Sequence, residues 1–229
     1  MIPSEPINIL TIQFANTISH HEIPLFRGAV IHSLENKLLL FHNHDGENYR
    51  YAYPLIQYKR IKGKAAIVCI NQGTEDIGEL FSSHFSSIRL GEKGIDISIE
   101  KIFPQRIRVQ IWEHLFPYRI NNWIPFNSHN YNTFKQLDSL KEKTVFLENI
   151  LVGNVLSFAK GINVHFEKEV KCVIIDYTEI HSTNIKGVTK QCFQVVFNCN
   201  VSIPNYIGLG KHVSINYGVV TRIKEKSEE

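Results

Sequence analysis

The order of the predicted strands and helices in the first 104 residues most constrains the fold of this chain. Runs of β-branched or alternating residues predict strands, and Pro24 followed by apolar residues at helical spacing predicts a helix from about Leu25 to Glu35. A second helix is expected from about Glu75 to His84. The four strands are expected at Ile7–Phe14, Tyr49–Tyr58, Lys64–Ile70 and Ile95–Phe103. The resulting order, βαββαβ, is that of a ferredoxin-like unit.

The residues beyond Pro104 predict a second small domain of the same kind. An alternating segment begins at Ile107, and a helix with one apolar face is expected between an N-cap at Thr144 and Gly161. Strands are expected at Asn163–Tyr177 and Cys192–Val201, with a last one after a glycine-rich segment, whereas Phe116–Asn132 is expected to be a loop. We therefore predict two small α+β domains, residues 1–104 and 105–229, of which the first is ferredoxin-like and the second repeats its helix-and-antiparallel-strand pattern more loosely.

Composition is typical of a globular protein of the cytoplasm. The chain has 43% hydrophobic residues and a net charge of +3, which permits a phosphate-rich partner without demanding one. The four cysteines form no C-x-x-C pair, so reduced, buried thiols are favoured over a metal or disulfide role. The N-terminus does not follow the pattern of a signal peptide, and no apolar run approaches the roughly 20 residues that span a bilayer. We expect a cytoplasmic protein without membrane association.

The glycine-rich segment 207–220 is the most informative local motif. It places Gly208, Gly210 and Gly218 around Lys211 and His212, between two predicted strands. Glycine lets the backbone approach a ligand closely, so the segment could offer N–H groups to phosphate oxygens. The spacing excludes both the P-loop and the dinucleotide-binding fingerprint. A glycine-punctuated turn with a purely structural role remains the alternative.

Three segments together resemble a known family. They are Pro24–Ala29 with the histidine-bearing loop after it, Tyr51–Lys59, and the glycine-rich segment, in which Asn216 takes the place of one glycine. These segments resemble the CRISPR-associated endoribonucleases that cut repeat RNA into guide units, in the variant group with distinct N- and C-terminal domains. The resemblance implies tandem ferredoxin-like domains of the RAMP type, CRISPR repeat RNA as partner and no cofactor. It leaves open other CRISPR effector subunits and a homodimer.

The candidate catalytic residues are His42 and His44. If their loop is extended, side chains two positions apart lie on one side of it, about 6.6 Å apart along the chain. One imidazole could then deprotonate a ribose 2′-OH while the other protonates the leaving 5′-oxygen. The resemblance places the active histidine in the preceding helix or in this loop. The alternatives are that both are solvated loop residues, or that the site uses His20 and His21, whereas His32 is expected to be packed.

A metal site is the competing interpretation of the same histidines. His-x-His with a nearby carboxylate is a metal-ligand pattern, but Glu47 follows His44 too closely for the cupin spacing and no downstream histidine motif completes it. We expect no metal and no cofactor.

Candidate RNA-binding residues cluster at a predicted hairpin tip and in the glycine-rich segment. Lys59, Arg60, Lys62 and Lys64 place four cations within six residues, which would attract phosphate, although such charges also protect sheet edges. Lys211, His212 and Arg222 give the second domain a positive region of its own. The aromatic residues of Phe116–Asn132 either stack on unpaired bases or, as we prefer, close a domain interface. The expected function is metal-independent RNA cleavage; the runner-up is a non-cleaving RNA-binding module of the same fold, and a protein without a nucleic-acid role is the third interpretation.

Overall fold

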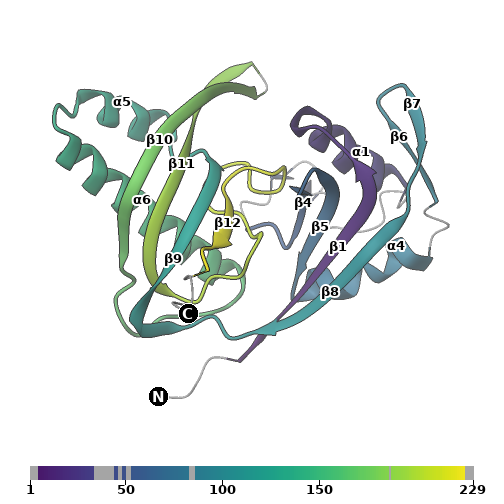
Figure 1. Cartoon of the computed structure of the whole chain (residues 1–229), viewed down its shortest axis with the longest axis horizontal. Coiled ribbons are helices and arrows are strands. Elements are labelled where there is room, and N and C mark those ends of the chain that lie inside the picture. Colours follow the sequence, from purple (N-terminus) through teal and green to yellow (C-terminus); the bar gives the residue numbers. More distant parts are fainter. Residues whose placement is uncertain are drawn as a thin grey trace, which may run out of the picture. The chain divides into compact units, whose positions relative to one another are not determined.

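The computed structural model describes residues 5–33, 44–45, 48–49, 53–82, 86–185 and 187–224. These residues form two compact units (Figure 1). The N-terminal unit comprises Glu5–Arg108 together with Ser214–Asn216, and the C-terminal unit comprises Val109–Val213 and the segment that begins at Tyr217. The chain therefore leaves the first unit after Arg108 and returns to it for three residues near its end.

The N-terminal unit has the ferredoxin-like strand order that the sequence predicts. Its sheet runs β4-β5-β1-β8, with every neighbouring pair antiparallel. The first crossover contains a short 3-10 turn, η1, and helix α1, and the second contains helices α3 and α4. The bounds are β1 Ile7–Thr17, η1 His20–Glu22, α1 Ile23–Ser33, β4 Ile56–Ile61, β5 Lys64–Ile70, α3 Gln72–Asp76, α4 Gly78–Ser82 and β8 Ile99–Ile107.

Several boundaries in this unit differ from the sequence prediction. The second helix begins at Gln72 and is interrupted at Ile77, so it forms two short helices. A hairpin that was not predicted, β6 (Ser87–Leu90) and β7 (Lys93–Asp96), precedes β8. Pro104, taken as the domain boundary, lies inside β8 opposite Leu10. A proline is compatible with this strand because β8 is at the edge of the sheet, where one row of N–H groups needs no partner.

An apolar core holds the helices of this unit on its sheet. Phe26 of α1 makes edge-to-face contacts with Phe14 of β1 and Tyr58 of β4, at centroid distances of 5.6 and 5.9 Å. All three side chains are fully buried. Such contacts fix the angle of α1 on the sheet and thereby the position of η1, the turn that leads into it.

The C-terminal unit repeats the strand order of the first. Its sheet runs β10-β11-β9-β12, again antiparallel throughout. The first crossover contains helices α5 and α6, but the second, residues 202–218, contains no helix and carries most of the glycine-rich segment. The bounds are β9 Ile111–Trp123, α5 Ser128–Gln136, α6 Leu140–Gly161, β10 Cys172–Ile185, β11 Val188–Val201 and β12 Val219–Arg222.

The predicted loop at Phe116–Asn132 is wrong. Strand β9 continues to Trp123, and α5 begins at Ser128. The asparagines that suggested a loop have other roles: the Asn127 side chain caps α5 by accepting from the Asn130 N–H, and Asn122 has a left-handed φ of 49°.

Helix α6 also begins earlier than predicted. Its N-cap is Ser139, whose side chain and backbone exchange hydrogen bonds with Glu142, whereas Thr144 lies within the helix and donates to the Leu140 carbonyl. Within the described residues, no helix is long and apolar enough to cross a membrane.

Candidate functional site

The predicted catalytic pair lies at the margin of the described chain. His42 falls outside the described residues, and so does most of the loop around it. The backbone of His44 opens the two-residue strand β2 (His44–Asp45), which pairs antiparallel with β3 (Asn48–Tyr49). Residue 44 is therefore extended, the conformation on which the expected spacing of the pair rests. The catalytic role of the two histidines stays a prediction.

The other candidate histidines lie around α1. His32, expected to be packed, is exposed in the last turn of the helix. His20 and His21 form η1 just before the helix, with His20 half-buried and His21 exposed. Their rings lie 6.3 Å apart, nearly edge to face.

The four cations predicted at one hairpin tip do not share one environment. Lys62 and Gly63, with φ of 50° and 85°, form the two-residue turn between β4 and β5, and Lys62 and Arg60 are exposed. Lys59 is fully buried, and burial lowers its pKa to about 7. A fully buried side chain cannot take part in a surface contact with RNA, so the expectation for Lys59 is wrong and Arg60 and Lys62 carry the exposed charge of the tip.

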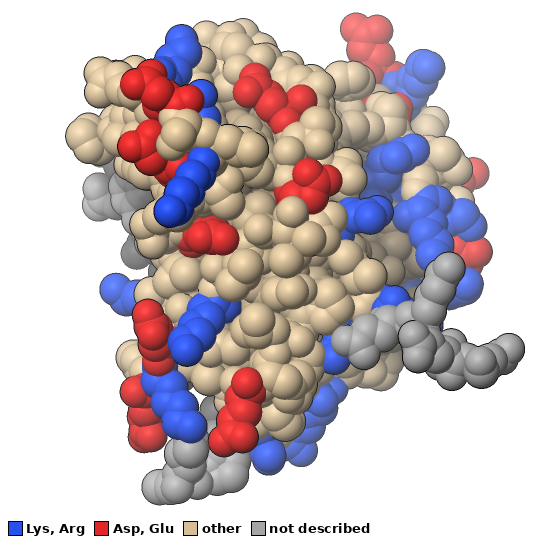
Figure 2. Space-filling view, turned by 60° about the vertical axis from the view of Figure 1, so that its left-hand side comes forward, with Lys and Arg blue, Asp and Glu red and all other residues tan. Residues whose placement is uncertain are grey.

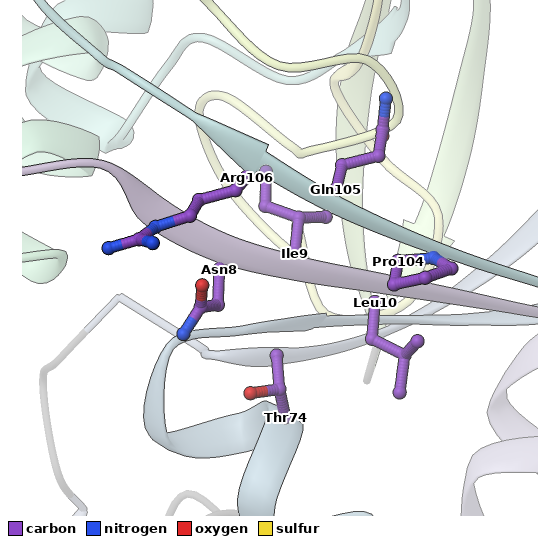
Figure 3. Close-up of a pocket in the computed structure, with 7 residues that line it drawn as sticks. All are labelled: Asn8, Ile9, Leu10, Thr74, Pro104, Gln105 and Arg106. Atoms are coloured by element: carbon purple, nitrogen blue, oxygen red, sulfur yellow. The ribbon is translucent and has the colours of Figure 1, made fainter.

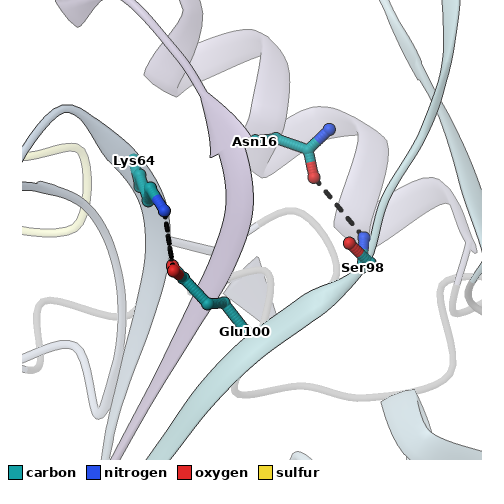
Figure 4. A network of polar contacts seen from close by, with 4 residues as sticks. All are labelled: Asn16, Lys64, Ser98 and Glu100. Atoms are coloured by element: carbon teal, nitrogen blue, oxygen red, sulfur yellow. Dashed lines mark hydrogen bonds and ion pairs between the residues drawn. The ribbon is translucent and has the colours of Figure 1, made fainter.

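Lys64 is committed to an ion pair. Its Nζ lies 2.8 and 2.7 Å from the two carboxylate oxygens of Glu100 on β8 (Figure 4). The hydrogen bonds from Lys64 hold the pKa of Glu100 below its usual range. Nearby, the Ser98 N–H donates to the Asn16 side chain. This pair joins β5 to β8 across β1 and neutralises Lys64, so the charge of Lys64 is less available to an anion than the charges of Arg60 and Lys62.

The glycine-rich segment binds its own unit through the backbone. The Leu209 N–H donates to the Gly218 carbonyl and the Gly218 N–H donates to the Asn122 carbonyl, both at 2.9 Å. The Lys211 N–H donates to the Ile124 carbonyl at 3.0 Å. These three N–H groups belong to the segment whose backbone was predicted to bind phosphate, and all three are satisfied within the C-terminal unit.

Steric requirements explain two of the glycines. A Cβ on Gly210 would lie 2.7 Å from Trp123 Nε1, and a Cβ on Gly218 would lie 1.8 Å from the Leu209 carbonyl oxygen. Both residues also have left-handed φ, 96° and 61°. The absence of a Cβ on these glycines therefore lets the backbone pack against Trp123 and Leu209 of the same unit. This favours the interpretation that Gly210 and Gly218 have a structural role. Gly208 is buried.

The polar residues of the segment have different exposures. Lys211 is exposed, whereas His212 is half-buried, has a φ of 55° and contacts the Tyr217 ring edge to face. Arg222 at the end of β12 lies over the Phe116 ring, 4.3 Å from its centroid. Lys211 is thus the cation of this segment that is best placed to meet a phosphate.

Residues 214–216 belong to the N-terminal unit. Ile215 forms a parallel bridge with Tyr58, and the Tyr58 N–H donates to the Ser214 carbonyl at 2.8 Å. The Asn216 side chain, 6% exposed, accepts from the Arg60 N–H and contacts the His20 ring. Sequence reasoning treated Asn216 only as a tolerated substitute for glycine, and its φ of 70° agrees with that, but it missed the contacts.

The aromatic residues considered for base stacking are mostly inside the C-terminal unit. Tyr118, Trp123 and Phe126 are buried, and only Tyr131 is half-exposed. The Trp123 indole N–H donates to Asn154 on α6 at 2.9 Å, and the Tyr118 hydroxyl donates to the Val201 carbonyl. These residues hold helix and sheet together, so none of the three is a stacking platform.

The surface carries a depression on the N-terminal unit and an uneven distribution of charge. An open depression of about 410 Å³ on the N-terminal unit has one charged residue, Arg106, among its walls (Figure 3). Its lining residues are Asn8, Ile9, Leu10, Thr74, Pro104, Gln105 and Arg106. On the face in Figure 2, acidic and basic side chains are mixed on the left, and Lys and Arg gather toward the right. Among the described residues, no group of three or more His, Cys, Asp or Glu is arranged to hold a metal ion.

Models of one protein family match both halves of the chain. A Cas6b N-terminal domain model matches residues 5–108, and a Cas6b C-terminal domain model matches residues 110–223. An uncharacterized protein of Methanocaldococcus jannaschii is 37% identical over 114 residues, covering 49% of this chain and 76% of that protein.

Solved structures show the same fold. A Cas6b crystal structure is similar at a TM-score of 0.88 and 22% identity, covering 95% of this chain and all of that one. A structure named CRISPR RNA processing endoribonuclease Cas6b is similar at a TM-score of 0.74 and 20% identity, with the same coverage. Two tandem ferredoxin-like units that match both Cas6b domains identify the chain as a member of the Cas6b family.

Proposed function

We propose that this protein is an endoribonuclease that cuts CRISPR repeat RNA and so produces guide RNAs. The observation that carries the proposal is the match of both units to the two Cas6b domains, in a fold shared with a protein named as a CRISPR RNA processing endoribonuclease. A scaffold alone does not define an activity, so the proposal depends on the residues that this chain places on it.

His42 and His44 are the proposed general acid and base. The base removes the proton of a ribose 2′-OH, the oxygen attacks the adjacent phosphorus, and the acid protonates the departing 5′-oxygen. The products are a 2′,3′-cyclic phosphate and a 5′-OH. Because the nucleophile belongs to the RNA and histidine titrates near neutral pH, this route needs no metal ion.

Exposed cations supply the proposed attraction for the RNA backbone. Arg60 and Lys62 lie at the hairpin tip of the N-terminal unit, and Lys211 lies on the glycine-rich segment of the C-terminal unit. Each phosphate contact adds a salt-dependent increment to binding. Gly208, Gly210 and Gly218 would support this site indirectly, by fixing the path of the segment that carries Lys211 and His212.

The first test concerns the mechanism. Wild-type protein is incubated with its repeat RNA in excess EDTA, and with a repeat that carries deoxyribose just upstream of the cut. We expect cleavage in EDTA, and no cleavage of the deoxy substrate although it still binds. Cutting of the deoxy substrate at the normal rate would refute attack by the 2′-OH.

The second test concerns the histidine pair. His42→Ala and His44→Ala should each slow cleavage by roughly 10²–10⁴-fold, with a much smaller effect on RNA affinity. His32→Ala, which removes an exposed histidine from the preceding helix, is the matched control and should cleave normally. Undiminished cleavage by the His42/His44 double variant would exclude the pair. Tight binding without cleavage by the wild type would instead favour the runner-up, a non-cleaving RNA-binding module.

A further inference from the structure

Two cysteines of the C-terminal unit lie with their sulfur atoms close together. Cys172 opens strand β10, Cys199 lies near the end of β11, and the two residues are directly opposite each other in the sheet. Both are free thiols, and their Sγ atoms are 3.5 Å apart, with the Cys172 thiol donating to Cys199. The two cysteines are 27 positions apart in the chain, so no sequence motif indicated this contact.

The strand register places this pair at a position that accepts a disulfide. The Asn200 N–H donates across the ladder to the Lys171 carbonyl, whereas the Ile174 N–H donates to a side chain of α6 and not to β11. Because hydrogen-bonded and non-hydrogen-bonded pairs alternate along an antiparallel ladder, Cys172 and Cys199 form a non-hydrogen-bonded pair. The Cα atoms of such a pair are about 4.5 Å apart, within the range of roughly 4.4–6.8 Å found in disulfides. Rotation of the two side chains therefore suffices to bring the sulfurs to bonding distance.

Hydrogen bonds make Cys199 the more acidic of the two thiols. Its Sγ accepts from the Cys172 thiol at 3.5 Å and from the Val201 N–H at 3.4 Å. The hydrogen bond from Cys172 is the main reason that the pKa of Cys199 lies below its usual value, although burial opposes it. The same hydrogen bond, together with burial, raises the pKa of Cys172. Cys199 is therefore the sulfur that reacts first as a thiolate.

The other two cysteines are ordinary core thiols. Cys69 on β5 and Cys192 on β11 are fully buried. Burial raises the pKa of both, to about 11 for Cys192. Since the thiolate is the reactive form of cysteine, both are poor nucleophiles. They provide internal controls for the reactivity of the pair.

The position of β10 gives the pair a route to solvent. Within the described residues this strand pairs only with β11, so it is an edge of its sheet. Cys172 is 7% exposed, and Lys171 and Val173 on either side of it are exposed. Local opening of an edge strand costs less free energy than unfolding of the whole unit. A small oxidant can therefore reach the sulfurs while the unit stays folded.

We propose that Cys172 and Cys199 are a redox-active pair that a peroxide oxidises to an intramolecular disulfide. The Cys199 thiolate attacks one oxygen of hydrogen peroxide, the O–O bond breaks, and a sulfenic acid forms as hydroxide leaves. The Cys172 sulfur then attacks the sulfenic sulfur, the S–O bond breaks, and the departing hydroxyl takes the Cys172 proton and leaves as water. The two thiols lose two electrons in total, and hydrogen peroxide gains them.

The disulfide would join an edge strand covalently to its neighbour inside the sheet and so stabilise the C-terminal unit. The site goes beyond the proposed function and does not depend on it, because neither RNA nor the catalytic histidines take part. The competing explanation is that Cys172 and Cys199 are small apolar residues that only fill the core.

The test uses reduced wild-type protein in native buffer. The protein is treated with hydrogen peroxide, the peroxide is removed with catalase, and free thiols are alkylated in urea before mass spectrometry. We expect one disulfide, seen as a linked peptide pair that contains Cys172 and Cys199, while Cys69 and Cys192 are recovered alkylated. The control is the same oxidation carried out in urea, where the chain no longer holds the two sulfurs together and the disulfides should spread over other pairs.

Variants and melting temperature provide independent arms. Cys172→Ala and Cys199→Ala should each abolish the disulfide, whereas Cys192→Ala, a buried cysteine of the same strand as Cys199, is the matched control and should retain it. Oxidation should raise the melting temperature of the wild type and of Cys192→Ala by about 5 °C or more, and dithiothreitol should reverse the shift. Circular dichroism checks that each variant is folded.

Four results would overturn the site. The first is no disulfide in the native wild type after a treatment that fully oxidises the chain in urea, which means that the oxidant does not reach the pair. The second is oxidation of Cys199 or Cys172 to a sulfinic acid without a disulfide, which means that the sulfurs do not meet. The third is the same mixture of disulfides in native buffer as in urea. The fourth is a melting temperature that falls on oxidation. None of these results bears on cleavage of RNA.

Discussion

The two units share a strand order but differ in how they build the second crossover. In the N-terminal unit the helices α3 and α4 and the hairpin β6–β7 lie between β5 and β8, so this crossover contains regular secondary structure. In the C-terminal unit residues 202–218 connect β11 to β12 without a helix. The Gly218 and Lys211 N–H groups donate to the Asn122 and Ile124 carbonyls at the end of β9. The same topology therefore tolerates a non-helical crossover where a neighbouring strand supplies the acceptors. The consequence is a segment that depends on glycine.

Gly218→Ala should break this arrangement and have the largest effect on stability. The new Cβ would lie 1.8 Å from the Leu209 carbonyl oxygen, a backbone atom, and alanine is disfavoured at a φ of 61°. We expect the free energy of unfolding of the C-terminal unit to fall by about 4 kcal/mol or more. Urea unfolding followed by circular dichroism measures the change.

Glycines in helices provide the matched comparison. A Cβ on Gly153 of α6 or Gly28 of α1 meets no atom within 4 Å. Gly153→Ala and Gly28→Ala should therefore raise stability by about 0.5–1 kcal/mol, because alanine is the better helix former. If Gly218→Ala unfolds at the same urea concentration as the wild type, the glycine-rich segment is not packed as described and the contrast between the crossovers is lost.

Strands β4 and β10, which occupy the corresponding position in the two sheets, also differ in what covers them. In the N-terminal unit β4 is buried on both faces, and the bridge between Tyr58 and Ile215 adds a neighbour beyond it. In the C-terminal unit the described residues pair β10 only with β11, and Val173 and Ile175 are exposed. Residues 214–216, which belong to the N-terminal unit, thus extend its sheet beyond β4.

Lys59→Met tests the burial of β4. Desolvation lowers the pKa of Lys59 to about 7, below the value of about 10.4 expected in the unfolded chain. Between these values the unfolded state binds more protons, so this residue makes stability rise with pH from about 7 to 10. Lys59→Met should stabilise the N-terminal unit by about 2 kcal/mol near pH 7 and remove that rise. Lys101→Met, at an exposed position on β8, is the control, and an equal effect at both positions would contradict the burial of Lys59.

The sequence predicts the N-terminal unit better than the C-terminal one for a physical reason. The order of strands and helices along the N-terminal unit follows from the hydrophobic periodicity of each segment. That periodicity is a local property of the sequence, so it can be recognised without knowing the fold. In the C-terminal unit Asn122 and Asn127 were interpreted as loop residues, because an asparagine at a left-handed position or at a helix cap has the same local signature as one in a loop.

The candidate site was predictable in part. Charge and turn residues locate the hairpin tip, but they do not show that Lys59 is buried while Arg60 is exposed, since that depends on what packs on each face of β4. The contact between His20 and Asn216 joins residues far apart in the chain. No periodicity or motif reports such a contact, so only the fold could reveal it.

The smallest predicted effect concerns a feature that the units share. Each unit has a Ser-x-x-Glu turn in its first crossover, at Ser19–Glu22 and Ser139–Glu142, and in each the serine N–H donates to the glutamate. Ser139→Ala should lower stability by about 1 kcal/mol through loss of the cap of α6, without changing RNA affinity. Ser19→Ala retains the backbone N–H that donates to Glu22 and should have a smaller effect on stability.

The pH dependence of Ser139→Ala sharpens this last comparison. Hydrogen bonds from Ser139 lower the pKa of Glu142, so their contribution to stability is present above the unfolded pKa and is lost as pH falls through the folded pKa. The stability difference between wild type and Ser139→Ala should therefore shrink as the pH is lowered from neutral into the acid range. Urea unfolding of both proteins over that series measures the difference. If the stability difference between wild type and Ser139→Ala does not change as the pH is lowered, the ionised Glu142 does not take part in the cap. The two Ser-x-x-Glu turns would then be alike in sequence and not in their interactions.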